Sequence, residues 1–139
     1  MAIGASFSIV GLVDLSLMWF PLGFGDPAWE FGTLSQTFTS LPPTAFGLVL
    51  VAYAFVSHPA LGAGWARVAA VIFALGAIVL AVMGFLFLTV IPEVMRQTPP
   101  EGAEAVIRVV IINGVEVVLY PVVFAAISVL LWRGVEKHS

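Results

Sequence analysis

The chain has 139 residues, of which 61% are hydrophobic and 9% are charged, and its formal net charge is −3. Soluble domains carry about a quarter charged residues, so this chain has too little polar surface to cover a water-soluble globule and must be solvated mainly by lipid. It has no basic block that would bind nucleic acid, and its lack of cysteine excludes disulfides and thiolate metal sites.

Four apolar stretches predict an all-α fold, a four-transmembrane-helix bundle that forms a single integral membrane domain over residues 1-139. Helices are expected because a backbone in lipid must satisfy its own hydrogen bonds. The predicted spans cover approximately 3-22, 42-58, 65-91 and 105-132. A span needs about 20 residues, so the second is short, while the third and fourth should tilt or protrude.

The first stretch is predicted to be a retained span rather than a cleaved signal peptide. No Lys or Arg precedes it, Asp14 interrupts its apolar core, and no small-x-small cleavage site follows. A signal peptide has the opposite features, namely a basic start and a small-residue cleavage site.

The segment 23–41 between the first two spans, "GFGDPAWEFGTLSQTFTSL", predicts a short helix in the membrane interface. Asp26 is a good N-cap, and Pro27 suits the first helical position. One apolar stripe follows, at Phe31, Leu34 and Phe38. Such a stripe beside polar residues is typical of a helix that lies on a bilayer, so we expect the second span to begin at Pro42.

Residues 26–55, "DPAWEFGTLSQTFTSLPPTAFGLVLVAYAF", resemble the region that follows the first span in HpsJ-like small polytopic membrane proteins. The similarity lies in the Asp-Pro-x-Trp start, the short amphipathic segment and the Leu/Pro turn into a glycine-containing span. This chain has "TSLPP" where the family usually has Asp-Arg before the second span. The family is associated with polysaccharide export loci and exosortase systems, so the resemblance implies an accessory membrane protein.

The third span carries a seam of small residues that predicts a helix-packing interface. The residues recur at i, i+4, i+7, i+11 and i+14, at Ala70, Ala74, Ala77, Ala81 and Gly84. Membrane helices associate through close packing of such residues, and this period matches left-handed packing at about +20°. The pattern leaves open whether the neighbouring helix belongs to this chain or to another.

The distribution of basic residues predicts that both termini are cytoplasmic. With four spans, the N-terminus, the 59–64 turn and the C-terminus share one side, which carries Arg67, Arg133 and Lys137, whereas the other side is mainly acidic. We therefore expect a multi-pass protein of a bacterial-type plasma (inner) membrane. Four tryptophans are predicted interfacial anchors, Trp19 and Trp29 on the outer side and Trp65 and Trp132 on the inner side.

Two acids, Asp14 and Glu116, lie inside predicted spans. An ionised acid in mid-span costs about 2.5–3.5 kcal/mol on insertion scales, so each should be neutral, paired or hydrated. At ~1.5 Å per residue both lie about 12 Å deep, which raises the hypothesis that they share a site. On the fourth span, Asn113, Glu116 and Tyr120 form one polar stripe that should face the bundle.

Three interpretations of this intramembrane polar cluster remain open. In the first, a protonated Asp14 or Glu116 forms hydrogen bonds with Asn113 and Tyr120 that hold helices together, each worth about 0.6 kcal/mol. In the second, the two acids bind a proton or cation and titrate as a coupled pair. In the third, either acid meets a basic or polar group on another subunit.

The sequence contains no histidine in the middle of a span and no HExxH, GxSxG or glycine-rich phosphate motif. We therefore predict no enzyme activity, no catalytic residues, no metal and no cofactor, and a membrane enzyme ranks third among the functions. The leading hypothesis is a non-enzymatic accessory or scaffold subunit that binds other membrane subunits or itself in the lipid bilayer. The alternative is a small proton- or cation-coupled transporter that acts as an oligomer.

Overall fold

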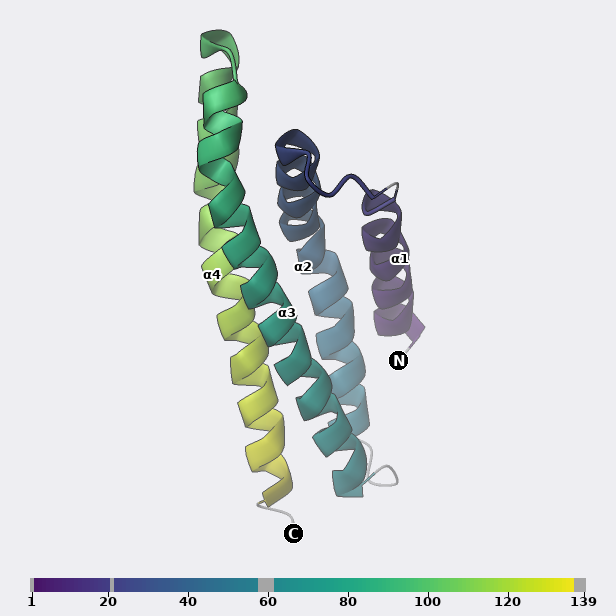
Figure 1. The fold of residues 1–139 in the computed structure, drawn as a ribbon. Coiled ribbons are helices and arrows are strands. Elements are labelled where there is room, and N and C mark those ends of the chain that lie inside the picture. Colours follow the sequence, from purple (N-terminus) through teal and green to yellow (C-terminus); the bar gives the residue numbers. More distant parts are fainter. Residues whose placement is uncertain (1, 21, 58–61, 137–139) are drawn as a thin grey trace.

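The computed structural model describes residues 2–20, 22–57 and 62–136, which form four helices and no strand. The helices are α1 (Ala2–Met18), α2 (Pro27–Ser57), α3 (Gly62–Gln97) and α4 (Pro100–Glu136). They run alternately in opposite directions, so the start of α1 and the end of α4 lie toward the same end of the bundle (Figure 1). The all-helical prediction is confirmed. Lys137 and the first part of the predicted 59–64 turn lie outside the described residues.

Three of these helices are long and apolar enough to cross a membrane, over Pro27–Ala54, Gly64–Gln97 and Pro100–Gly134. The chain therefore has the features of an integral membrane protein. The apolar part of α1, Ile3–Met18, is shorter. The whole of α1 has 17 residues and extends about 25 Å at ~1.5 Å per residue, against a hydrocarbon core of about 30 Å. A membrane crossing by α1 thus stays a prediction.

The predicted interfacial helix is not a separate element, because it is continuous with the predicted second span in α2. Its apolar stripe does not lie on a membrane surface: Leu34 is 3% exposed and Phe38 is 0% exposed. These side chains are buried because the rings of Phe31 and Phe38 contact Phe87 of α3, with ring centroids 5.3 and 6.3 Å apart. The apolar stripe of Phe31, Leu34 and Phe38 is therefore part of the bundle core and not a membrane-surface face, which corrects the prediction.

The N-terminus of α2 has the expected cap, but its two internal prolines do not end it. The Ala28 amide donates to Asp26 Oδ1 at 3.0 Å, as an N-cap requires. Pro42 and Pro43 lie inside the helix and are exposed. A proline removes a backbone donor and crowds the preceding turn, yet membrane helices tolerate it where the freed carbonyls find other partners.

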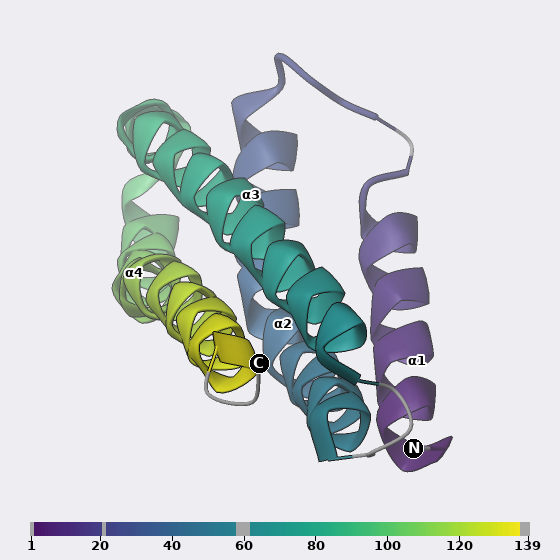
Figure 2. The same ribbon diagram turned by 90° about the horizontal axis from the view of Figure 1, so that it is seen from below.

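The four helices pack in two pairs that meet through α2. Helix α1 packs against α2, α3 packs against α4, and α2 contacts both α3 and α4. Figure 2 shows α1 and α4 on opposite sides of α2. Among the described residues α1 contacts neither α3 nor α4. The first helix is therefore peripheral.

Small residues bring the α1 and α2 backbones close together. Gly4 and Ser8 of α1 lie against Gly47 of α2, where an added Cβ would be 2.8 Å from both the Gly4 carbonyl oxygen and the Ser8 amide nitrogen. Gly11 lies equally close to the Thr44 side chain. Close approach of this kind is the usual source of attraction between membrane helices.

Two residues of the predicted small-residue seam of α3, Ala70 and Gly84, lie against α4 of the same chain. The Ser128 hydroxyl of α4 donates to the Ala70 carbonyl at 2.7 Å, and Val117 of α4 packs on Gly84. Ala77 is buried and Ala74 is half-buried, whereas Ala81 is exposed. The seam is interleaved with larger buried side chains at Phe73, Leu80 and Phe87. The combined 3–4 spacing is that of left-handed helix packing.

We predict that Gly47→Ala destabilises the protein by about 1–3 kcal/mol, because the new methyl group meets backbone atoms of α1 that cannot rotate away. The matched control is Gly32→Ala in the same helix, where an added Cβ has nothing within 4 Å. That variant should be neutral or slightly more stable, since alanine is the better helix former. Unfolding in mixed micelles measures both, and equal stabilities would contradict the close packing of α1 on α2.

Candidate functional site

A polar side chain of α4 links that helix to α2 inside the bundle. Asn113 is 2% exposed, and its Nδ2 donates to Ser35 Oγ of α2 at 2.5 Å. Buried polar groups need such partners because water cannot reach them. The contact therefore fixes the position of α4 beside the first half of α2.

Glu116 and Tyr120 follow Asn113 by three and seven residues on α4. The Tyr120 hydroxyl lies near the Glu116 carboxyl group, and both side chains are partly buried. The second carboxyl oxygen, Oε2, is buried and has no hydrogen-bond partner among the described residues, and the same is true of Asn113 Oδ1. A buried acceptor without a partner costs about 1–3 kcal/mol, so this pair of oxygens calls for a donor.

The helices that pack against α4 supply no charge to this cluster. Residues 31–52 of α2 and 68–92 of α3 contain no Asp, Glu, Lys, Arg or His. Arg108 is the basic residue of α4 nearest in sequence to Glu116, and it is exposed and bonded to Glu104 at 2.6 Å. The surroundings of the Glu116 carboxyl are thus apolar side chains and neutral hydrogen-bonding groups.

The structure separates Asp14 from the cluster, which corrects the hypothesis of a shared acidic site. Asp14 is exposed on α1, and α1 contacts α2 but not α4. Although Asp14 and Glu116 have the same estimated depth, they do not share a site, because α2 lies between α1 and α4. Ser35 is a residue of the site that the sequence pattern does not indicate, because it lies within the segment predicted to be an interfacial helix. Only the continuation of α2 through Pro42 places this serine inside the bundle.

The cluster lies level with one of the predicted aromatic anchors. The Trp19 indole Nε1 donates to Thr37 Oγ1 at 3.2 Å, two residues from Ser35 and thus about 3 Å further along α2. Trp19 also contacts Trp29, with ring centroids 5.9 Å apart. The other two anchors, Trp65 and Trp132, are exposed near the opposite end of the bundle. The Ser35–Asn113 contact therefore lies close to the level at which α1 ends.

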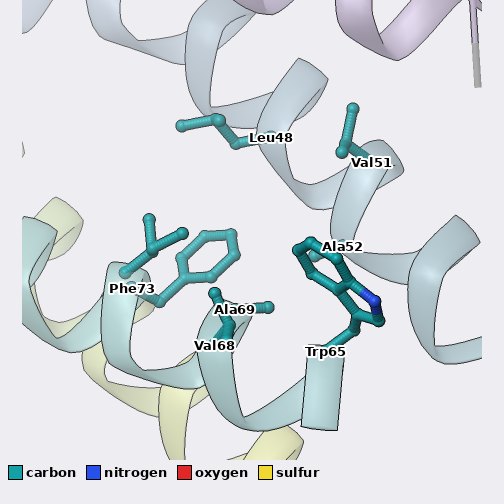
Figure 3. Close-up of a pocket in the computed structure, with 8 residues that line it drawn as sticks. Leu48, Val51, Ala52, Trp65, Val68, Ala69 and Phe73 are labelled. Carbon is teal, nitrogen blue, oxygen red and sulfur yellow. The ribbon is translucent and has the colours of Figure 1, made fainter. Parts of the chain in front are cut away.

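A groove of about 110 Å³ opens between α2 and α3 at the Trp65 end of the bundle (Figure 3). Its lining is apolar and consists of Leu48, Val51, Ala52, Trp65, Val68, Ala69, Ile72 and Phe73. Trp65 lies beside Ala52, while Phe73 lies at the far side of the groove. Such a lining offers van der Waals contact without directional recognition, which suits an acyl chain or an apolar side chain.

The polar cluster offers a carboxyl group and an amide oxygen, which can bind a proton or accept a hydrogen bond. Within the described ranges no three His, Asp or Glu side chains lie close enough together to hold one. Its polar groups without a partner are one carboxyl oxygen of Glu116 and the amide oxygen of Asn113, three residues apart on α4. Both accept hydrogen bonds, and neither has a cation nearby.

The chain matches no protein-family model, no curated protein and no solved structure. The resemblance of residues 26–55 to HpsJ-like proteins therefore stays a prediction.

The hydrogen bond between Ser35 and Asn113 should appear as an energetic coupling in a double-mutant cycle. We expect Ser35→Ala and Asn113→Ala, alone and together, to give a coupling energy of about 0.6–1.7 kcal/mol in unfolding measurements. The matched control is Ser16→Ala, which removes an exposed hydroxyl bonded to the Leu12 carbonyl of its own helix. Combined with Asn113→Ala it should be additive to within about 0.3–0.5 kcal/mol. Additivity of the Ser35 pair would show that α4 is not held to α2 here.

Proposed function

We propose that this protein is a four-span integral membrane protein that serves as a non-enzymatic accessory or scaffold subunit of a larger membrane assembly. The observation that carries the proposal is the exposure of α4. Only 11% of its most apolar 18-residue segment is buried within the chain. Although α4 packs along α3, a membrane helix with so few buried residues leaves much of its surface available to another protein.

The exposed face of α4 has the pattern of a helix-packing surface. Its apolar residues recur at i, i+4, i+7 and i+11, at Ile111, Val115, Val118 and Val122. This is the 3–4 spacing of left-handed packing between helices. All four side chains are β-branched, so they hold one rotamer in a helix and lose little entropy when a neighbouring helix packs against them.

The proposed topology counts α1 as the first span. The helix is extended by an apolar segment that includes Phe20 and Leu22, both exposed, which brings its reach toward the ~30 Å of the hydrocarbon core. Arg67 near the start of α3 and Arg133 near the end of α4 lie at the end of the bundle where α1 begins. By the positive-inside rule this end is cytoplasmic in a bacterial-type plasma (inner) membrane.

One observation favours the alternative, a small proton- or cation-coupled transporter that acts as an oligomer. The unpartnered buried oxygen of Glu116 is a feature that such a transporter needs, because intramembrane acids mark proton and ion pathways. A path would have to be completed by a second copy of the chain. Unchanged pH-driven flux in Glu116→Gln and in Asp14→Asn would reject this alternative.

Site-specific photo-cross-linking in the native membrane tests the accessory proposal. We expect a photoreactive residue at Val118, which is 64% exposed, to form an adduct with another protein chain. The matched control is the same residue at Phe124, on the buried face of the same helix, which should react only within the chain. Both positions are on α4, so the contrast depends only on which face of the helix carries the photoreactive residue.

The native mass of the protein, extracted together with its own lipid, decides between the two functions. A complex that contains other chains supports the accessory subunit, whereas a pure homodimer favours the transporter. A single chain with only lipid adducts at Val118 would contradict the accessory proposal.

A further inference from the structure

We propose that Glu116 is a proton-binding site, in which a carboxyl proton retained at neutral pH is donated to Asn113 Oδ1. The two residues are three positions apart on α4, so their Cβ atoms are about 5–6 Å apart on one face. Each carries a buried oxygen without a partner among the described residues, Glu116 Oε2 and Asn113 Oδ1. A proton on the carboxyl group supplies the donor that both oxygens lack.

The contact with Ser35 determines which end of the Asn113 amide faces the carboxyl group. Because Asn113 Nδ2 donates to Ser35 Oγ, the amide oxygen Oδ1, which is an acceptor, is the group left to face Glu116. An ionised carboxylate is also only an acceptor, so the two oxygens would repel each other. A neutral carboxylic acid has one O–H donor, which converts the repulsion into a hydrogen bond. The Tyr120 hydroxyl, which can both donate and accept, lies near the carboxyl group.

No charged group on the packed helices stabilises an ionised Glu116. Helices α2 and α3 pack against α4, and their facing segments, residues 31–52 and 68–92, contain no acid, base or histidine. Beyond these segments, Glu93 and Arg96 of α3 are paired with each other at 2.8 Å. A carboxylate surrounded by apolar groups without a cation is unfavourable relative to its neutral form.

The remaining titratable groups near α4 are also engaged or distant. Arg108 is paired with Glu104 one turn away, and Asp14 is exposed on α1, which does not contact α4. Glu30 is on the first turn of α2 and accepts a hydrogen bond from the Gly25 amide at 2.8 Å. Tyr120 is thus the titratable group in direct contact with Glu116.

The proton would control the contact between α2 and α4. With Glu116 protonated, Ser35, Asn113 and Glu116 form a continuous series of hydrogen bonds across the two helices. Loss of the proton breaks the bond between Asn113 and Glu116 and leaves a charge near the buried amide oxygen. This inference goes beyond the accessory function and does not depend on it, since it concerns the protonation of one side chain.

Infrared spectroscopy of the protein in lipid vesicles tests the proposal. At neutral pH we expect a C=O band of a protonated carboxyl group, which disappears in Glu116→Gln and persists in the matched control Asp14→Asn. In Asn113→Ala the band should shift in frequency because its acceptor is gone. Raising the pH should remove the band as the proton is lost.

A second test uses the unsubstituted protein with ¹³C-carboxyl-labelled glutamate, so its result does not depend on whether a variant folds. The band should move to lower frequency with the label. An absent or unmoved band at neutral pH would overturn the proposal, because Glu116 would then be ionised. A band that keeps its frequency in Asn113→Ala would overturn the proposed hydrogen bond.

Discussion

The contact of Phe87 with Phe31 and Phe38 joins the two helix pairs of the bundle. Phe87 on α3 is 0% exposed, and the two rings of α2 lie around it at 5.3 and 6.3 Å. In lipid the removal of apolar surface from water does not drive helices together, so shape-complementary packing has to do so. Aromatic pairs contribute about 0.5–1.5 kcal/mol beyond their buried area. This junction is where the α1–α2 pair meets the α3–α4 pair.

The same aromatic contact places the polar site. Ser35 follows Phe31 by four residues and precedes Phe38 by three, so all three side chains share one face of α2. When the two rings are packed against Phe87, Ser35 is presented toward α4, where Asn113 hydrogen-bonds to it. A variant that displaced Phe87 would therefore be expected to disturb a hydrogen bond to which it contributes no atom. The site depends on apolar packing for its geometry and on buried polarity for its chemistry.

The sequence was sufficient for features that depend on local pattern. Apolar length predicted the helices, and the spacing of Asn113, Glu116 and Tyr120 predicted a shared face of α4. The extent of α2 was not predictable in the same way, because the Pro42–Pro43 pair is a strong helix-stop signal. Here the helix continues through both prolines. That continuity turned a predicted surface stripe into core and brought Ser35 into the site.

Features that depend on the order of helices in space were beyond the sequence. Counting residues along each helix put Asp14 and Glu116 at one depth, but depth does not decide which helices are neighbours. The structure places α2 between α1 and α4, so the two acids cannot meet within one chain. The seam of α3 had a similar ambiguity: its residues indicated an interface, and only the structure identified α4 as the neighbour at Ala70 and Gly84.

The proposed partner surface and the proposed proton site lie on different faces of α4, and this limits how one can affect the other. At 100° per residue, Val115 and Val118 lie on the side of the helix opposite Asn113 and Glu116. A partner helix on the exposed face would thus contact α4 without reaching the proton site. Any effect of the Glu116 proton on assembly would have to act by moving α4 as a whole against α2. The packing of Val117 on Gly84 resists such movement, since the backbone of α3 is directly behind it. A coupling between proton binding and assembly therefore requires the α3–α4 pair to move together, with the slip occurring at the contact with α2.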